Sequence, residues 1–222
     1  MTNTASTPVA DHVANVIAGM AQQVPGDVLQ AFGAEQTALD SAGVPAGIAE
    51  AGMPMPDAEL LDVNANTTTL ERARAGRAAV VVFYRGAWCP FCNAALRVYQ
   101  SELAGELDEH GAALIAVSPQ KPDGSLTMKE ANELSYAVLS DPGNRIGRQL
   151  GIVTRPTDEV QRAQAALGLD LTTVNADGSH DILMPTVAIV DADGILRWID
   201  VHPNYTTRTE PAQILAALTS LG

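Results

Sequence analysis

The fold is decided by residues 78–92, which read AAVVVFYRGAWCPFC. The run 78–84 is apolar and rich in Val, a pattern typical of a strand that is buried on both faces. Pro90 suits the first turn of a helix, because the N–H group that proline lacks has no intrahelical partner there. The stretch therefore predicts a strand, a short turn and a helix, with Cys89 and Cys92 at the start of the helix.

Strands and helices alternate on the C-terminal side of this stretch. Apolar runs at 113–117, 137–139 and 186–190 predict further strands, and residues 59–63 predict a short edge strand. Segments of helical periodicity separate the inner strands, among them a helix expected from Cys92 to about His110. The turn at 191–194 leads into a returning strand, which makes a β-hairpin. Alternation of this kind implies a mainly parallel sheet between helices, to which the hairpin adds antiparallel strands. We therefore predict an α/β three-layer sandwich with a mixed central sheet over residues 53–222.

Residues 1–52 form a separate N-terminal extension. Their apolar side chains recur at helical spacing, for example at Val13, Ile17 and Met20, so we expect helices there. No catalytic motif falls in this region. We interpret it as an arm for packing or dimerisation, which leaves a homodimer open.

The composition excludes several classes of protein. The chain has 222 residues, 46% of them hydrophobic, and a formal net charge of −13. A surface this acidic repels phosphate backbones, which argues against nucleic-acid binding. No Lys or Arg precedes Arg72, and no apolar run approaches the roughly 18 residues of a membrane span. We expect a soluble, cytoplasmic protein without a secretory signal and without membrane attachment.

Cys89 and Cys92 are the only cysteines of the chain. Two cysteines separated by two residues indicate thiol–disulfide chemistry in an intracellular protein. One alternative is a pair of buried, small apolar side chains. A zinc site is another, but zinc prefers four ligands at paired spacings, and the four histidines are scattered. We favour a redox pair and expect no metal or other cofactor.

The start of a helix favours a reactive thiolate. Unpaired backbone N–H groups and the positive end of the helix dipole stabilise negative charge there, which lowers a cysteine pKa below its free value of about 8.5. We expect Cys89 to be the exposed sulfur at the mouth of the helix, with Cys92 one turn further on. Either sulfur can attack while the other closes a disulfide, so the residues alone leave the order open.

Four residues are candidates for supporting the pair. Arg85 can stabilise a thiolate or polarise a peroxide oxygen, with a surface salt bridge as the alternative. Trp88 is expected to shield the site, and Tyr84 ends the strand that leads to it. Pro185 stands immediately before the strand at 186–190, where a cis-proline can approach a disulfide; a trans-proline that starts the strand is the alternative.

The cysteine stretch, followed by a helix and later by Met184-Pro185-Thr186, resembles the thioredoxin fold. The wider chain, over residues 53–220, resembles the peroxiredoxin-like branch, the alkyl hydroperoxide reductase/thiol-specific antioxidant family. The segments that carry this resemblance are FYRG at 83–86, VSPQ at 117–120, VLSD at 138–141, DADG at 191–194 and the stretch 204–211. The resemblance implies a thioredoxin-like fold, a hydroperoxide substrate that is reduced by a cysteine thiol, and a thioredoxin-like or low-molecular-weight thiol as electron donor.

The chain departs from the family at two positions. Typical members have a Thr three residues before the attacking Cys and a Pro four residues before that Thr. Counted back from Cys92, these places hold Cys89 and Arg85; counted back from Cys89, they hold Gly86 and Val82. The peroxiredoxin register favours Cys92 as the attacking sulfur, whereas the thioredoxin register favours Cys89.

These observations support three functional hypotheses. The first is a thiol peroxidase whose Cys-x-x-Cys pair cycles through sulfenic acid and disulfide. The second is a protein disulfide oxidoreductase of the thioredoxin or glutaredoxin kind, without strong peroxidase activity. The third is a redox-sensing module without catalytic turnover.

Overall fold

The Val-rich run forms the strand at the centre of the sheet. In the computed structural model, which describes residues 8–220, β3 (Ala79–Phe83) is buried along its whole length. It pairs in parallel with β4 (Ala113–Ser118) and antiparallel with β8 (Thr186–Val190). The seven-stranded sheet has the order β2-β1-β5-β4-β3-β8-β9 within the described residues, and its other strands are β1 (Glu59–Leu61), β2 (Thr67–Thr69), β5 (Ala137–Ser140) and β9 (Leu196–Val201).

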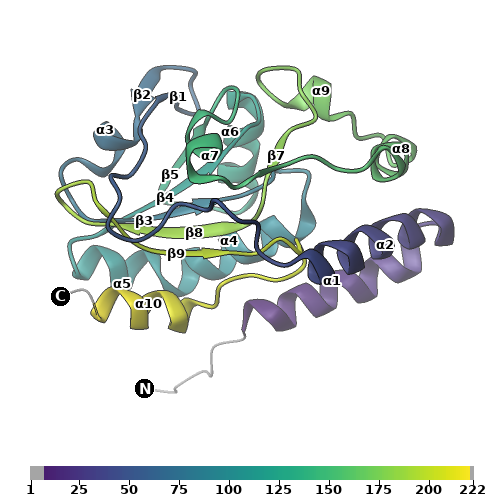
Figure 1. The fold of residues 1–222 in the computed structure, drawn as a ribbon, viewed down its shortest axis with the longest axis horizontal. Helices are drawn as coiled ribbons and strands as arrows, with labels where there is room; N and C mark the ends of the chain where they lie inside the picture. Colours follow the sequence, from purple (N-terminus) through teal and green to yellow (C-terminus); the bar gives the residue numbers. More distant parts are fainter. Residues whose placement is uncertain (1–7, 221–222) are drawn as a thin grey trace.

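Helices cover both faces of this sheet, as the sequence predicts. Alternate side chains of β3 enter two apolar clusters, with Val80 and Val82 in one and Val81 and Phe83 in the other. Figure 1 shows α4, α5 and α10 below the sheet and α7 above it. The bounds of these helices and of their neighbours are α3 (Leu70–Arg74), α4 (Pro90–Glu102), α5 (Ala104–Glu109), α6 (Pro122–Ala131), α7 (Arg145–Leu150) and α10 (Pro211–Thr219). The prediction of an α/β three-layer sandwich with a mixed sheet is confirmed.

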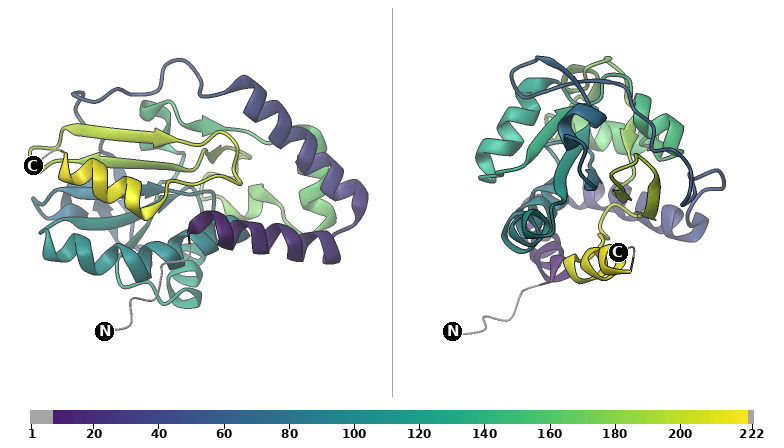
Figure 2. Two further views of the ribbon diagram at one scale, coloured as in Figure 1. Left: turned by 90° about the horizontal axis from the view of Figure 1, so that it is seen from below. Right: turned by 90° about the vertical axis from the view of Figure 1, so that its left-hand side faces the viewer.

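The N-terminal extension forms two helices, α1 (Val9–Gln23) and α2 (Gly26–Ala42). They make a V at one end of the sheet, where α1 packs on α4 and α2 packs on α8 (Asp158–Ala166) (Figure 2). The carboxylate of Glu210 accepts hydrogen bonds from the backbone N–H groups of Val9 and Ala10, at 2.8 and 2.9 Å. The start of α1 is therefore fastened to the C-terminal part of the chain.

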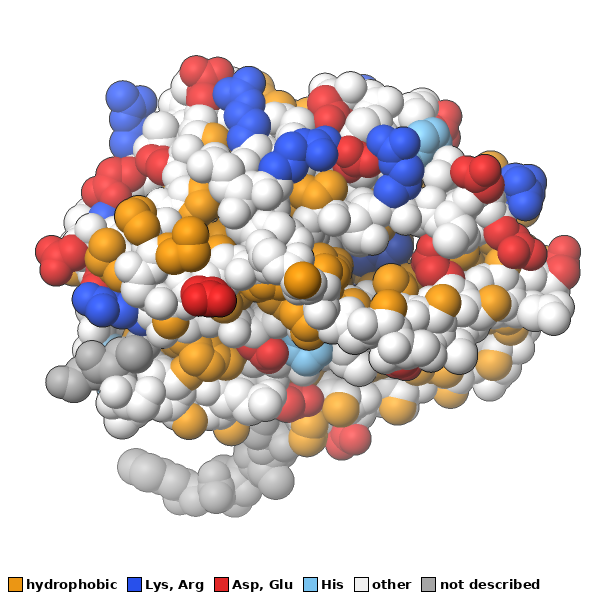
Figure 3. Space-filling view, in the orientation of Figure 1, with side chains coloured by type: hydrophobic (Ala, Val, Ile, Leu, Met, Phe, Trp, Pro, Cys, Tyr) orange, Lys and Arg blue, Asp and Glu red, His pale blue; other side chains and the backbone are white. Residues whose placement is uncertain are grey.

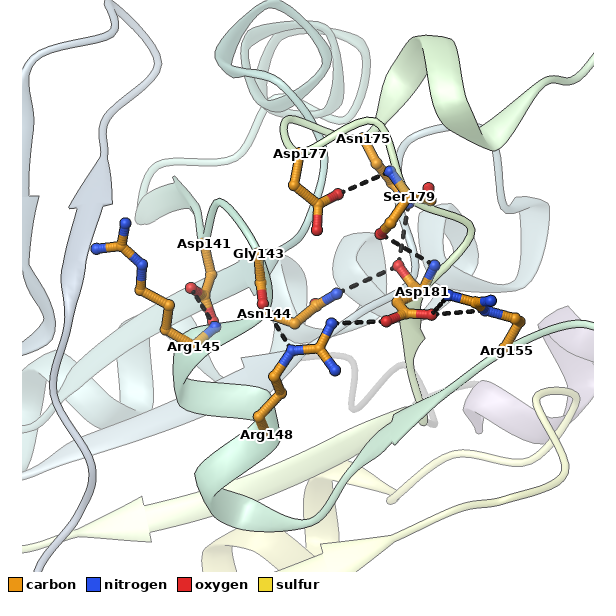
Figure 4. A network of polar contacts seen from close by, with 10 residues as sticks. All are labelled: Asp141, Gly143, Asn144, Arg145, Arg148, Arg155, Asn175, Asp177, Ser179 and Asp181. Atoms are coloured by element: carbon orange, nitrogen blue, oxygen red, sulfur yellow. Dashed lines mark hydrogen bonds and ion pairs between the residues drawn. The ribbon is translucent and has the colours of Figure 1, made fainter.

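The segment between α7 and β8 adds a small subsheet and two helices. Its elements are β6 (Val153–Thr154), α8, α9 (Leu171–Val174) and β7 (Ile182–Leu183). Asp181 lies at the centre of a polar network in this segment (Figure 4). Its carboxylate accepts from Arg148 at 2.6 Å and from Arg155 at 2.8 Å, while its backbone carbonyl accepts from Asn175 at 3.0 Å. The network fixes the chain just before β7 and the proline that follows.

Several local expectations are wrong. Pro185 is not a cis-proline, because none of the peptide bonds described in residues 8–220 is cis. The strand at 59–61 is not at the edge, since β2 pairs on its outer side. The helix expected from Cys92 to His110 is interrupted at Leu103, where α4 ends and α5 begins. Among the described residues, no helix is long and apolar enough to cross a membrane.

Candidate active site

The two cysteines lie where the loop after β3 turns into α4. Cys89 is the residue that immediately precedes the helix, and Cys92 lies in its first turn. The amide of Asn93 fixes this loop by donating to the carbonyl oxygens of Ala87, at 2.7 Å, and Cys89, at 2.9 Å. The cysteines thus lie at the start of α4, as the sequence predicts, and the backbone N–H groups of Cys92 and Asn93 donate to the carbonyl oxygen of Cys89 at 3.0 and 3.1 Å.

The turn requires glycine at position 86. Gly86 has a φ of +150°, and a Cβ at this position would lie 2.9 Å from Oε1 of Gln120 and still closer to the Trp88 ring. The same Gln120 oxygen accepts a hydrogen bond from the backbone N–H of Ala87 at 2.8 Å. Gln120, which follows β4, therefore holds the turn from the neighbouring strand, a role that the sequence analysis did not assign to it.

Both sulfurs are buried free thiols that lie close together. Each cysteine is 1% exposed, and neither forms a disulfide in this structure. The two residues lie 3 Å apart at their side chains. The expectation that Cys89 is exposed at the helix mouth is wrong, because α1, α2 and the end of α8 stand around it. The proximity of the sulfurs suits formation of a disulfide between them.

The two sulfurs differ in protonation state because their surroundings shift their pKa values in opposite directions. Burial by itself raises the pKa of Cys92, but the hydrogen bond with Cys89 and the charge of Arg208 outweigh burial and lower that pKa to about 5. The backbone N–H of Arg85 also supports the Cys92 thiolate. Burial, together with the adjacent Cys92, raises the pKa of Cys89. The pair is therefore a Cys92 thiolate beside a neutral Cys89 thiol at neutral pH.

Arg208 is the cation that touches the thiolate. Its Nη2 lies 3.3 Å from Sγ of Cys92, while its Nη1 donates to the carbonyl oxygens of Tyr205 and Thr207, both at 2.6 Å. The loop that carries Arg208 is tied to α4 by the Tyr99 hydroxyl, which donates to the carbonyl of Thr209 at 2.6 Å. The loop belongs to the family-like segment 204–211, but no local signal in the sequence distinguishes Arg208 from any other arginine in a loop.

Arg85 is also buried beside the pair, but it differs from Arg208 in its contacts. Its side chain makes no hydrogen bond to either sulfur; its guanidinium carbon lies 3.9 Å from the ring centroid of Tyr205 and 5.0 Å from that of Trp88. The residue is 4% exposed. The alternative reading of Arg85 as a surface salt-bridge residue is therefore wrong, while Trp88 lines the cavity beside Cys89.

Tyr84 and Pro185 lie on the inner side of the pair. Together with Cys92 and Arg208 they line a small cavity of about 10 Å³. Burial raises the pKa of Tyr84, so its hydroxyl stays protonated. The structure thus brings all the predicted site residues together around the two sulfurs.

A much larger cavity lies on the other side of the pair. It has a volume of about 440 Å³, reaches Cys89 but not Cys92, and is bounded by α1, α2 and the end of α8. A second cavity of about 270 Å³ lies between α2 and the β6–β7 pair and shares Arg85 and Tyr205 with the first. Figure 3 shows a recess beside α2, with Lys or Arg atoms visible inside it and hydrophobic side chains along its lower edge. The sulfur with the low pKa is therefore not the one that faces the larger cavity.

The described residues offer no obvious metal site. Within residues 8–220, no group of three or more His, Cys, Asp or Glu side chains is placed to hold a metal ion.

Comparisons with known proteins point in one direction. A family model described as the AhpC/TSA family matches residues 51–199. The "Putative peroxiredoxin Rv2521" of Mycobacterium tuberculosis is 30% identical over 95 residues, which are 43% of this chain and 59% of that protein. The chain thus spans less than two thirds of the length of this relative.

Solved structures share the fold. Peroxidoxin BcpB from Mycobacterium tuberculosis superposes with a TM-score of 0.59 at 19% identity, over 78% of this chain and 98% of that one. Reduced Prx3 from Vibrio vulnificus, solved in complex with hydrogen peroxide, superposes with a TM-score of 0.62 at 20% identity, over 77% and 99% of the two chains. These neighbours confirm the thioredoxin-like architecture.

Proposed function

Because the chain belongs to the AhpC/TSA family, we propose that it is a thiol peroxidase that reduces hydrogen peroxide or organic hydroperoxides through Cys92 and Cys89. One observation carries the proposal: the Cys92 sulfur, with its pKa lowered to about 5, lies 3.3 Å from the guanidinium of Arg208. A thiolate that is stabilised at neutral pH is the form that attacks a peroxide oxygen.

The reaction proceeds in balanced steps. The Cys92 thiolate attacks the terminal oxygen of the hydroperoxide, the O–O bond breaks, and Cys92 becomes a sulfenic acid while the remaining oxygen leaves as alkoxide or hydroxide and takes up a proton. The Cys89 thiol then displaces the hydroxyl of the sulfenic acid, so that a disulfide and water form. An external thiol donor then supplies two electrons, which reduce the Cys89–Cys92 disulfide to the two thiols.

The Cys89 side chain takes over part of the role of the missing threonine. In the peroxiredoxin register, Cys89 occupies the place of that Thr, and here its thiol hydrogen bonds with Cys92. A hydroxyl at this place and a thiol both supply a donor next to the attacking sulfur. Cys89 differs from Thr because it can also close the disulfide, which makes this position both a donor and the resolving residue.

The division of the chain fits this assignment. We take residues 53–222 as the catalytic domain and residues 1–52 as an extension that covers its site, of which residues 1–7 lie outside the described structure. The family match over residues 51–199 supports the division. A chain with only two cysteines, separated by two residues, suits a reducing compartment better than a disulfide scaffold does, which favours the cytoplasm. A homodimer through the extension remains a further proposal.

A second function is favoured by one specific observation. Cys89, rather than Cys92, lines the large cavity, and a disulfide oxidoreductase must present a sulfur to an external disulfide. Reduction of a protein or small-molecule disulfide through Cys89 would then be the main activity. Loss of disulfide reduction in Cys89→Ser, with retention in Cys92→Ser, would favour this second function.

Stopped-flow oxidation tests the peroxidase directly. The reduced protein is mixed with hydrogen peroxide or an organic hydroperoxide, and its tryptophan fluorescence is followed, since Trp88 lies at the site. We expect a second-order rate constant at least about 100-fold above that of free cysteine, the range that general positioning and electrostatic stabilisation provide. A rate no faster than that of free cysteine would overturn the proposal.

A further inference from the structure

Arg85 is a buried cation whose charge helps to lower the pKa of Cys92, but no carboxylate among the described residues pairs with it. None of the ion pairs between described residues includes it, and none of their side-chain hydrogen bonds is made by its guanidinium; its Nε is buried without any partner. The rings of Tyr205 and Trp88 attract the charge but do not accept hydrogen bonds in the plane of the guanidinium. A buried guanidinium without a paired anion has a high desolvation cost, which a bound anion would offset.

The guanidinium lies where an external molecule can reach it. Arg85 lines the large cavity and also the second one, although the residue as a whole is 4% exposed. It is not needed as the direct partner of the thiolate, because Arg208 already fills that role at 3.3 Å. The free donors of Arg85 therefore point to a bound anion, and the planar donor set of arginine suits a carboxylate.

Most of the other side chains that line the large cavity are apolar, although Gln36 and Gln164 also reach it. Its walls come from α1, α2, the start of α4 and the end of α8, and the apolar side chains include Met20, Val24, Phe32, Phe91, Leu167 and Leu169. No Asp or Glu lines it. At about 440 Å³, the cavity falls within the range of small-molecule sites. This lining suits a small organic anion with an apolar part.

The position of Cys89 indicates which half of the catalytic cycle uses this cavity. Once the disulfide has formed, an incoming thiolate from the cavity meets the sulfur of Cys89, and the sulfur that leaves is Cys92. A thiol of lower pKa leaves faster, and Cys92 is the one with the low pKa. Attack at Cys89 is therefore the favourable direction for reduction.

We infer that the cavity at Cys89 binds the electron donor, and that this donor is a small thiol whose carboxylate is held by Arg85. The inference rests on the proposed function. The donor thiolate attacks Cys89, forms a mixed disulfide and releases the Cys92 thiolate. A second donor thiolate then attacks the donor sulfur of that mixed disulfide, so that the oxidised donor leaves and Cys89 takes up a proton. A protein donor would have to displace α1 and α2 to reach the buried Cys89, whereas a small thiol enters the cavity.

The test compares two thiols that differ only in one group. The Cys89–Cys92 disulfide is prepared with diamide, so that it can be made even if the protein does not react with peroxide. The reduction of this disulfide by mercaptohexanoate and by mercaptohexanol is followed by stopped-flow fluorescence. Each rate is divided by the rate at which the same thiol reduces oxidised glutathione, so that the intrinsic reactivity of the two thiols is taken into account. We expect the carboxylated thiol to be about tenfold faster, the size of one charge-assisted hydrogen bond.

Two variants and a matched control locate the effect. Arg85→Met should bring the ratio of the mercaptohexanoate rate to the mercaptohexanol rate close to one. This holds even if the substitution changes both rates by a common factor. Leu167→Glu should lower the rate for mercaptohexanoate selectively, because this residue lines the cavity and is 47% exposed, at its mouth. Val44→Glu adds the same charge at another exposed apolar residue that does not line the cavity, and should leave the ratio unchanged.

Three outcomes would overturn the inference. The first is a ratio near one in the unmodified protein. The second is a preference that survives in both Arg85→Met and Leu167→Glu. The third is a carboxylate preference that appears only in oxidation by hydroperoxides and not in reduction of the disulfide, which would assign the cavity to the oxidant.

Discussion

The Nη2 atom of Arg208 lies 3.3 Å from the sulfur of Cys92, although 116 positions separate the two residues in the chain. This contact joins the loop after β9 to the first turn of α4. The same loop is fixed by the hydroxyl of Tyr99, so the arginine is held in place from the helix that carries the sulfur. The charge of Arg208 is therefore positioned before any substrate arrives.

Arg208→Met should raise the pKa of Cys92. A hydrogen bond to a charged group contributes about 1.5–3 kcal/mol, which corresponds to roughly 1–2 pKa units. The ultraviolet absorbance of the thiolate, measured against pH in a Cys89→Ser background, gives the midpoint. Arg77→Met is the control, because Arg77 pairs with Asp108 at the surface and is 43% exposed at its side chain. An unchanged midpoint in Arg208→Met would show that the contact does not stabilise the thiolate.

The rate of peroxide oxidation should depend on pH with a midpoint near 5. The thiolate is the reacting form, and the Cys92 pKa is lowered to about 5, so reactivity persists at neutral pH and falls only as pH drops through that value. Above about pH 6 the rate should be constant, and well below the midpoint it should fall about tenfold per unit. Stopped-flow measurements at several pH values check this. A midpoint near 8.5, the value of free cysteine, would contradict the assignment.

Single-cysteine variants should separate the roles of the two sulfurs. After one equivalent of peroxide, Cys89→Ser should retain one added oxygen on Cys92, because the resolving thiol is gone. Cys92→Ser should react at least about 100-fold more slowly, since the Cys89 pKa is raised and little of it is thiolate. Mass spectrometry of the intact protein and of its peptides makes both measurements. Oxygen found on Cys89 in the first minutes would reverse the order.

Gly86→Ala should damage the site and the fold together. The new Cβ would require a strained φ of +150° and would lie within 2.9 Å of Gln120, close to Trp88 as well. We expect a loss of about 1–3 kcal/mol in the free energy of unfolding, measured with urea. Gly105→Ala is the matched control, because a Cβ there meets nothing within 4 Å and Gly105 lies inside α5. Equal stability of the two variants would contradict the role of Gly86.

Glu210→Gln should loosen α1. The carboxylate accepts from the N–H groups of Val9 and Ala10, and loss of a helix N-terminal cap costs about 0.5–2 kcal/mol. Hydrogen exchange of the α1 amides should accelerate more than that of α4. Glu109→Gln, at an exposed position in α5, serves as the control. Faster exchange spread evenly over the whole protein would point to general destabilisation instead.

The central part of the fold could be predicted because its signals are local. The Val-rich run of β3 and the proline at the start of α4 each specify their own element, and the spacing of Cys89 and Cys92 follows from that helix. The elements that escaped prediction are short: β2, α3, β6, α9 and β7 contain between two and five residues. Segments of this length are too brief to show a period.

The site could be predicted only in part, for a different reason. Arg85, Trp88 and Tyr84 adjoin the cysteines in sequence, so proximity in the chain identified them. Arg208 and Gln120 reach the site from other elements, and only the tertiary fold brings them there. The burial of Cys89 also depends on helices that precede it by many residues. For that reason the residues near the motif could not decide which sulfur would be the thiolate.

The hydrogen bonds between Glu210 and the start of α1 also determine when the site is completed during synthesis. Chains emerge from the ribosome N-terminus first, and domains fold as their parts become available. Helix α1 is made first but cannot be fastened until residue 210 has emerged, and Arg208 emerges almost at the same moment. The nascent chain therefore carries both cysteines without the Arg208 cation and without a fastened α1 until residues 208–210 have emerged. The lowering of the Cys92 pKa and the enclosure of Cys89 thus depend on contacts that become available almost together during synthesis.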